Sequence, residues 1–288
     1  LFDDVRVGPV DLKHGLHIDR LHIGLGDCLK LSLRCRPSQS QSLGKLPVVV
    51  TLQNSSPYLG LDFFLPVHQG RAAQNVLFSV LVKEGDIVPG NAHFDTTKGH
   101  IEYRRATALD CTIQAAYNTS LLHPFKGNMD LEKLEELLAN EADNIPMVEI
   151  TITNNAIGGQ PVSMANIRGT KAICDKYGKP LIIDSARFAE NAYFIKLREP
   201  GYHDKPVKEI VREMFSHADG MTMSAKKDTF ANMGGWLALN NDEWAEKART
   251  RLIMTEGFPT YGGLSGRDME CIATGLEEII HEDYLQYR

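Results

Sequence analysis

The chain has 288 residues, of which 43% are hydrophobic and 24% are charged, a composition typical of a globular protein with one large domain or slightly more. Its formal net charge of -6 gives no indication of a nucleic acid or an anionic membrane as partner. No apolar run approaches the ~18 residues of a membrane span. The five cysteines are scattered and form no CxxC pair, which predicts reduced thiols of a cytoplasmic protein.

The first 60 residues show no sustained helical period. Residues 21–26 and 47–52 are each compatible with a strand, and a polar stretch at 34–42 separates them. A coherent alternation of apolar and polar residues begins only at residue 61.

An apolar run at 62–67 ends in a glycine-containing turn that a helical pattern follows. Gly70 would let the backbone approach an anion, which the free amides of the helix start, the helix dipole and Arg71 would then bind. An ordinary helix start with a surface arginine has the same local sequence, so the turn alone leaves both interpretations open.

The polar stretch 91–100 surrounds one aromatic residue, and it predicts a strand end that runs into a loop. Phe94 is either a core residue or a flat support for a heteroaromatic ring. Both interpretations fit the local sequence.

Helices and strands alternate from residue 131 onwards. We expect helices at 131–140, 163–177, 187–197, 207–217 and 242–253, and strands at 147–153, 180–184, 219–224 and 234–239. This alternation predicts an α/β fold with a mainly parallel sheet and helices on both faces. Ligands of such sheets bind beyond the carboxyl ends of the strands, which is where Asn155, Asp184 and Lys227 fall.

These strand ends carry groups that suit one cofactor. A lysine beside a second cation and screened from water loses its proton more easily, as covalent catalysis by an amine requires, although Lys226 and Lys227 would also fit a solvated charge pair. Asp184, with Arg187 three residues later, fits a partner for a protonated ring nitrogen or a helix N-cap. A reactive amine, a carboxylate and a phosphate-binding turn together indicate pyridoxal 5'-phosphate.

The sequence resembles the β-eliminating lyases, the pyridoxal-phosphate family that contains tryptophanase and tyrosine phenol-lyase. The resemblance runs from about residue 60 to the end and is carried by PVHQGRAAQNVLF, NAHFDTTKGHIE, TNNAIGGQPVSMANIR, DSARFAENAYFIK, SAKKDTFANMGGW and FPTYGGLSGRDME. It implies the aspartate-aminotransferase type of fold (fold type I). It also implies a homotetramer activated by potassium or a similar monovalent cation.

The resemblance also assigns roles to individual residues. It implies that Lys227 binds the cofactor covalently, that Asp184 partners the ring nitrogen and that Phe94 stacks on the ring. It implies that the phosphate is bound by Gln69, Gly70, Arg71 and Ser224, with Lys226 nearby. Asn155 and Arg187 would lie near the phenolic oxygen, and the backbone carbonyl of Asn232 would help to hold the cation.

Within the family, the sequence is most similar to tryptophanase. Asp95 stands where the phenol-lyase pattern has no acid, and a carboxylate can accept the indole N–H or move protons at that ring. The implied reaction is α,β-elimination of L-tryptophan to indole, pyruvate and ammonia, with Lys227 as base at Cα and a separate acid at the indole carbon. Tyrosine phenol-lyase activity is the alternative.

The resemblance divides the chain into three segments. It predicts an atypical segment at 1–59, a pyridoxal-phosphate-binding large domain at 60–265, and at 266–288 the helix that leads to a C-terminal small domain. We interpret residues 13–58 as the product of a reading-frame slip. Since the family's active-site tyrosine and substrate-carboxylate arginine have no counterpart here, we expect slow turnover, or a non-catalytic fragment that binds cofactor or partner subunits.

Overall fold

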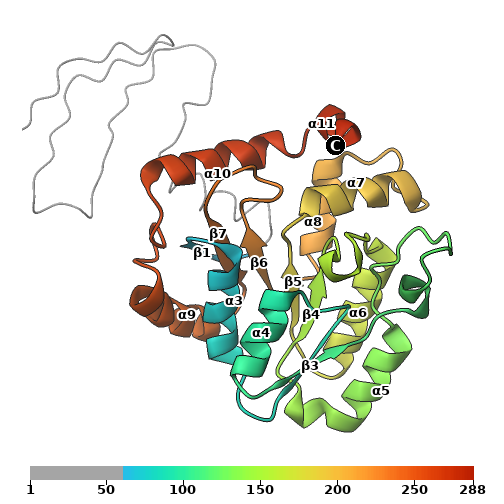
Figure 1. The fold of residues 1–288 in the computed structure, drawn as a ribbon, viewed down its shortest axis with the longest axis horizontal. Coiled ribbons are helices and arrows are strands. Elements are labelled where there is room, and N and C mark those ends of the chain that lie inside the picture. The colour runs from blue at the N-terminus through green and yellow to red at the C-terminus, as the bar shows by residue number, and fades with distance from the viewer. Residues whose placement is uncertain (1–60) are drawn as a thin grey trace, which may run out of the picture. The chain divides into compact units, whose positions relative to one another are not determined.

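The computed structural model describes residues 61–288, whose strands form a seven-stranded sheet in the order β1-β7-β6-β5-β4-β2-β3 (Figure 1). The strands are β1 (Phe63–Val67), β2 (Ile87–Gly90), β3 (Thr107–Asp110), β4 (Val148–Thr151), β5 (Leu181–Asp184), β6 (Gly220–Ser224) and β7 (Gly235–Leu239). Neighbours from β3 to β6 pair in parallel, whereas β7 is antiparallel to both β6 and β1. The predicted α/β class with a mainly parallel sheet is confirmed.

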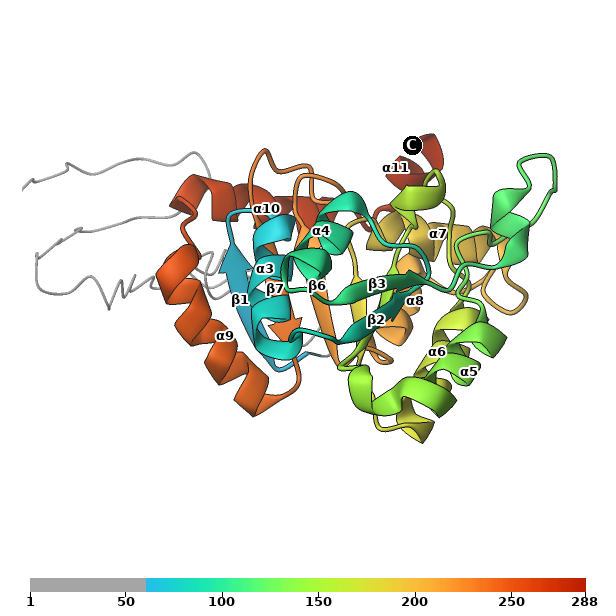
Figure 2. The ribbon, with the colours of Figure 1, turned by 60° about the horizontal axis from the view of Figure 1, so that its bottom comes forward.

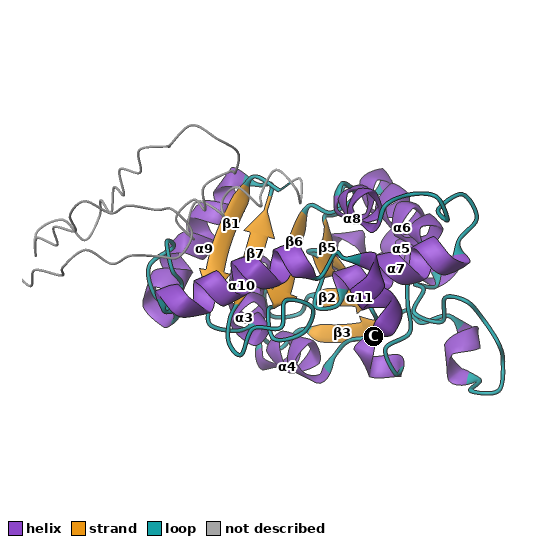
Figure 3. Ribbon diagram, turned by 90° about the horizontal axis from the view of Figure 1, so that it is seen from above, coloured by secondary structure: helices purple, strands orange, loops and turns teal. Residues whose placement is uncertain are grey.

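Helices cover both faces of this sheet. They are α3 (Gly70–Leu81), α4 (Asp95–Tyr103), α5 (Leu131–Glu141), α6 (Met164–Lys176), α7 (Phe188–Arg198), α8 (Val207–Phe215), α9 (Asp242–Thr255), α10 (Gly266–Glu278) and α11 (Glu282–Tyr287). Helix α3 packs on β1, β6 and β7 (Figure 2). Figure 3 shows α5 to α8 gathered beside β5, and α9 beside β1.

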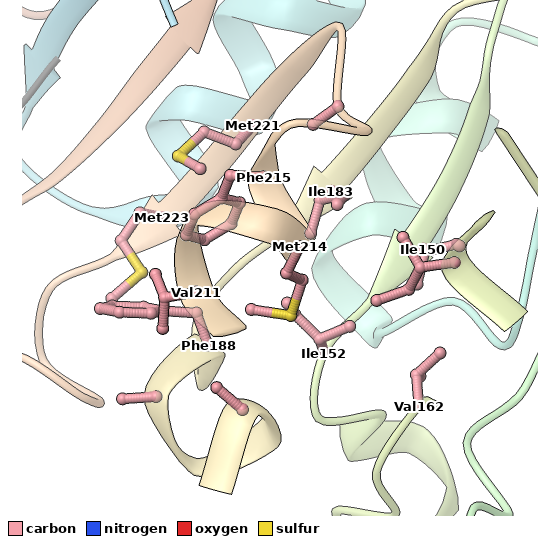
Figure 4. Packing of buried hydrophobic residues seen from close by; sticks show 14 of the residues in the cluster. Ile150, Ile152, Val162, Ile183, Phe188, Val211, Met214, Phe215, Met221 and Met223 are labelled. Carbon is pink, nitrogen blue, oxygen red and sulfur yellow. The ribbon is translucent and has the colours of Figure 1, made fainter. Parts of the chain in front are cut away.

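Two apolar clusters lie on opposite faces of the sheet because strand side chains alternate in direction. One cluster joins Ile150, Ile183 and Met221 to Met214 and Phe215 of α8 (Figure 4). The other joins residues of α3 and α9 to alternate strand positions such as Ile182 and Leu237. Trp236 belongs to the first cluster and Trp244 packs against the second.

Side chains fix the start of several helices, as expected for residues that satisfy the free amides of a first turn. Asp130 accepts a hydrogen bond from the Lys133 amide, and Ser163 accepts one from the Asn166 amide. Ser265 and Asp268 form a reciprocal capping box at the start of α10.

The prediction for residues 91–100 is wrong, because α4 begins at Asp95. Its Thr96, Thr97 and Gly99 have low helix propensity, so burial of Ile101 and the hydrogen bonds described below hold the helix in place. Strands β2 and β3 were not predicted either. The expected strands at 21–26 and 47–52 and the atypical segment 1–59 lie outside the described residues, and the division into domains stays a prediction.

Candidate active site

A pocket opens beyond the carboxyl ends of β4, β5 and β6, at the N-terminus of α3. Its lining includes most of the residues that the sequence suggested: Gln69, Gly70, Arg71, Phe94, Asn155, Asp184, Arg187, Ser224, Lys226 and Lys227. Asp95 and Asn232 are exposed and do not line it. Gln74, Thr96, Thr151 and Thr222 also line the pocket, although sequence reasoning missed them.

The turn before α3 is built for close packing. A Cβ atom at Gly70 would lie 2.7 Å from the Cβ of Ser224, so a larger residue would separate the helix from β6. The side-chain nitrogen Nε2 of Gln69 is 2.8 Å from Nε2 of His68, and the Nδ1 of His68 contacts Glu256. The helix start, with its free amides and positive dipole end, therefore lies next to Ser224 and is suited to an anion such as phosphate.

Asp184 ends β5 and is buried at the base of the pocket. Its Oδ1 accepts a hydrogen bond from the Ala186 amide at 3.2 Å, and its Oδ2 accepts one from Gln74 Nε2 at 3.1 Å. Burial raises the pKa of the Asp184 carboxyl to about 6, while Ala186, Arg187, Lys227 and Gln74 all act in the opposite direction.

In the structure, a different carboxylate, that of Asp228, binds the first turn of α7, the helix that Asp184 would cap. Asp228 is fully buried, and its Oδ2 accepts hydrogen bonds from the Ala189 amide at 2.8 Å and the Glu190 amide at 3.4 Å, in the first turn of α7. Its Oδ1 accepts one from Arg288 at 2.9 Å. The carboxylate of Asp228, beside Lys227, thus binds the first turn of α7, whereas Asp184 Oδ2 is hydrogen-bonded to Gln74.

Lys227 follows β6 and is half-buried, whereas Lys226 is exposed. Desolvation lowers the pKa of the Lys227 amine first, and the charges of Lys226 and Arg187 lower it further, against the opposing effect of Asp184. A lowered pKa increases the fraction of neutral amine, which is the nucleophilic form. Lys227 is therefore better suited to covalent chemistry than its neighbour.

Glu149 is a second carboxyl group on the same face of the sheet as Asp184. It lies on β4, its side chain is fully buried, and neither of its oxygens has a hydrogen-bond partner. Burial raises its pKa well above the usual value, and the charge of Asp184 adds to this effect. Burial therefore favours the protonated form of the Glu149 carboxyl.

The pocket contains the groups that pyridoxal 5'-phosphate requires. These are an anion-binding helix start, an aromatic face at Phe94, a buried acceptor for a ring N–H at Asp184 and an amine of lowered pKa at Lys227. By contrast, residues 61–288 contain no group of three or more His, Cys, Asp or Glu side chains that could hold a metal ion. The donor set fits an organic phosphate cofactor.

The sequence pattern of the family described as "Beta-eliminating lyase" matches residues 40–285. The chain belongs to this family. The tryptophanase of Salinibacter ruber is 62% identical over 227 residues, which are 79% of this chain and 48% of that protein. The tyrosine phenol-lyase of Symbiobacterium thermophilum is 48% identical over 230 residues, 80% of this chain and 50% of that protein.

Among solved structures, the cystathione gamma lyase of Micromonospora echinospora has a TM-score of 0.56 at 16% identity, over 82% of this chain and 53% of that one. Likeness at this identity shows the fold, and the fold-type I architecture expected for the β-eliminating lyase family is confirmed. The chain spans about half the length of the curated relatives that it matches. Within the described residues, no helix combines the length and apolar character needed to cross a membrane.

Proposed function

We propose that this chain is the cofactor-binding part of a pyridoxal 5'-phosphate-dependent lyase that splits L-tryptophan into indole, pyruvate and ammonia, with uptake of one water molecule. The observation that carries the proposal is that Lys227, Asp184 and the Gln69–Arg71 turn line one pocket. The 62% identity to a relative named tryptophanase, against 48% to one named tyrosine phenol-lyase, supports indole as the leaving group.

In this proposal the α3 end of the pocket binds the phosphate. The first amides of α3, Arg71 and the Ser224 hydroxyl are the donors, and Lys226 adds positive charge nearby. Gly70 and Ser224 are in close contact, so the phosphate would be held between two elements that cannot separate without loss of packing.

Phe94 and Asp184 orient the ring. Phe94 offers its flat face, and the charged form of Asp184 holds a proton on the ring nitrogen because an opposite charge at short range favours the charged form. Asn155 and Arg187 are the donors for the phenolic oxygen. When bound, pyridoxal 5'-phosphate supplies an electron sink for negative charge that develops at Cα of the amino acid.

Lys227 has two roles. Its amine would hold the cofactor covalently, and with the substrate bound the same amine would take the proton from Cα as a general base. Its lowered pKa suits both tasks because the neutral amine is the reactive form.

Asp95 is the proposed acid or acceptor at the indole ring. It begins α4, directly after Phe94, and is exposed. A carboxylate at this position can accept the indole N–H and so distinguish indole from phenol. Asp95→Asn should therefore lower indole release more than cofactor binding, as measured by indole assay and cofactor absorbance on the same preparation.

The cation and the assembly are also proposals. The backbone carbonyl of Asn232 would help to hold a potassium ion, and the complete site would form in a homotetramer. Cofactor absorbance should then be stronger in potassium chloride than in choline chloride, and light scattering should give the tetramer mass. Equal absorbance in both salts would contradict the cation site.

One experiment tests the function. Purified chain is mixed with pyridoxal 5'-phosphate, reduced with borohydride and mapped by peptide mass, and a second sample is assayed with L-tryptophan and L-tyrosine. We expect the label on Lys227 and release of indole. Release of phenol instead would indicate tyrosine phenol-lyase activity, bound cofactor without product would indicate a non-catalytic fragment, and a label on Lys226 would contradict the assignment.

A further inference from the structure

Gln74 is a polar side chain inside an apolar helix face. It is 3% exposed and lies on α3 among Ala73, Val76 and Leu77, which belong to the core. Burial of an amide costs free energy unless its donors and acceptor are bonded. The hydrogen-bond partners of Gln74 therefore indicate why a polar residue occupies this buried position.

Both ends of the Gln74 amide are bonded. Nε2 donates to Asp184 Oδ2 at 3.1 Å and to Thr97 Oγ1 at 2.7 Å, and Oε1 accepts from the Thr96 hydroxyl at 2.9 Å. An ionised carboxylate only accepts hydrogen bonds, so the amide must turn Nε2 towards Asp184. The Thr96 hydroxyl holds the amide in this orientation.

Charged groups from several elements act on the Asp184 carboxyl. Arg187 and Lys227 favour its charged form. Glu149 interacts with it from β4, and Arg71 of α3 interacts with Lys227. The amide adds a neutral donor to this set, and it favours the charged carboxylate without adding a charge to the pocket.

We propose that Gln74 is a positioning residue that fixes the Asp184 carboxylate for the ring nitrogen of pyridoxal 5'-phosphate, and that Thr96 fixes Gln74 in turn. This inference rests on the proposed function. Thr96 lies two residues after Phe94, in the first turn of α4. Hydrogen bonds therefore connect Asp184, through Gln74 and Thr96, to the segment that carries Phe94.

The first test compares two ligands. Gln74→Met keeps the length of the side chain and removes both polar ends, and Ser79→Ala on the same helix is the matched control. Loss of a hydrogen bond to a charged group should weaken the binding of pyridoxal 5'-phosphate ~10- to 100-fold. A phosphorylated analogue with C–H in place of the ring nitrogen should bind the variant and the wild type alike. Equal losses for both ligands would overturn the proposal.

The second test uses the pH dependence of cofactor affinity. In Gln74→Met the carboxyl at position 184 loses a donor and its pKa rises, so the loss relative to wild type should be greatest near pH 6 and smaller near pH 8.5. In Gln74→Glu the new carboxyl can donate only while protonated, so the loss should grow with pH as two carboxylates come to repel. Losses that change with pH in the same direction in both variants would overturn the proposal.

A third measurement needs no cofactor. The carboxyl carbon resonance of Asp184, assigned with Asp184→Asn, is titrated in the free chain, and Gln74→Met should move its midpoint to higher pH. If the wild type fails to attach the cofactor at Lys227, the proposed function fails, but this titration still tests Gln74. An unchanged midpoint would overturn the positioning role.

Discussion

The two faces of the central strands are equally buried but differ in chemistry. On the face covered by α5 to α8, β4, β5 and β6 contribute apolar side chains: Ile150, Ile183 and Met221. On the face towards α3 and α4, the alternate positions of the same strands include polar side chains beside Ile182: Glu149, Asp184 and Thr222. Both faces carry an apolar cluster, but only the face towards α3 and α4 also carries buried polar groups at these strands, which apolar packing alone would disfavour.

This difference separates stability from function. Buried polar groups cost free energy unless they are paired, and Glu149 has no partner at all. Such groups are expected where a site needs charge or directed donors. Substitutions of polar residues that line the pocket should therefore change cofactor binding, and substitutions of buried apolar residues on the opposite face should change unfolding.

The largest expected effect is at Lys227 in the pocket. Lys227→Ala removes the amine that we propose attaches the cofactor, so covalent labelling after borohydride reduction should be abolished. Lys226→Ala is the matched control and should keep the label, although its phosphate affinity should fall. A labelled Lys227→Ala protein would show that another amine does this chemistry.

Next in size is a substitution on the apolar face. Met214→Ala opens a cavity beneath β5 and should lower the free energy of unfolding by ~2–5 kcal/mol. Chemical denaturation measures this loss, and cofactor affinity below the transition should match the wild type. A specific loss of affinity would mean that the two faces are coupled.

Asp184→Asn sharpens the comparison from the polar side. It removes the charge that we propose holds the ring proton, and it should weaken cofactor binding ~10- to 100-fold. The Asp184 pKa of about 6 exceeds the ordinary 3.8, so wild-type stability falls as pH rises from 3.8 through 6. The variant should therefore melt no lower than wild type at pH 8, and a large drop in Tm with normal cofactor binding would mark Asp184 as a structural cap.

The smallest expected effect is at Glu149. Its folded pKa is raised, so the folded state keeps a proton that the unfolded chain loses, and wild-type stability falls as pH rises above the unfolded value near 4.5. Glu149→Met should therefore gain stability of about 1–3 kcal/mol at pH 8 and less at pH 5. Thermal unfolding at both pH values measures this, with Glu149→Gln as the isosteric control, and a gain independent of pH would contradict the assignment.

The sequence was informative where local pattern and tertiary structure agree. Strands β4, β5 and β6 are short apolar runs, and parallel strands bring their carboxyl ends to one edge, so Asn155, Asp184 and Lys227 could be placed together. Gln74 could not be predicted, because one polar residue in an apolar helical pattern does not indicate the partner that it faces. The only sequence signal is that Gln74 is a polar residue on the apolar side of the helix, which marks it as unusual without indicating Asp184 as its partner.

Other features depend on contacts between distant segments. The sequence of β7 resembles that of a parallel strand, and only its pairing with β6 and β1 makes it antiparallel. Helix α4 has weak local propensity, and the Thr96–Gln74 and Gln74–Thr97 hydrogen bonds join it to α3. Because α4 begins at Asp95, Phe94 precedes the helix and lines the pocket, whereas Asp95 lies in the first turn and is exposed.

The two tryptophans of the chain give each face its own optical reporter. Trp236 is 1% exposed, with Nε1 3.4 Å from the Met221 sulfur and its ring 5.4 Å from that of Phe64. Trp244 is half-buried on α9 against the opposite cluster. The emission of Trp236 should be blue-shifted and resistant to iodide, and that of Trp244 should be red-shifted and quenched. Single Trp→Phe variants would therefore let fluorescence follow the loosening of each face separately.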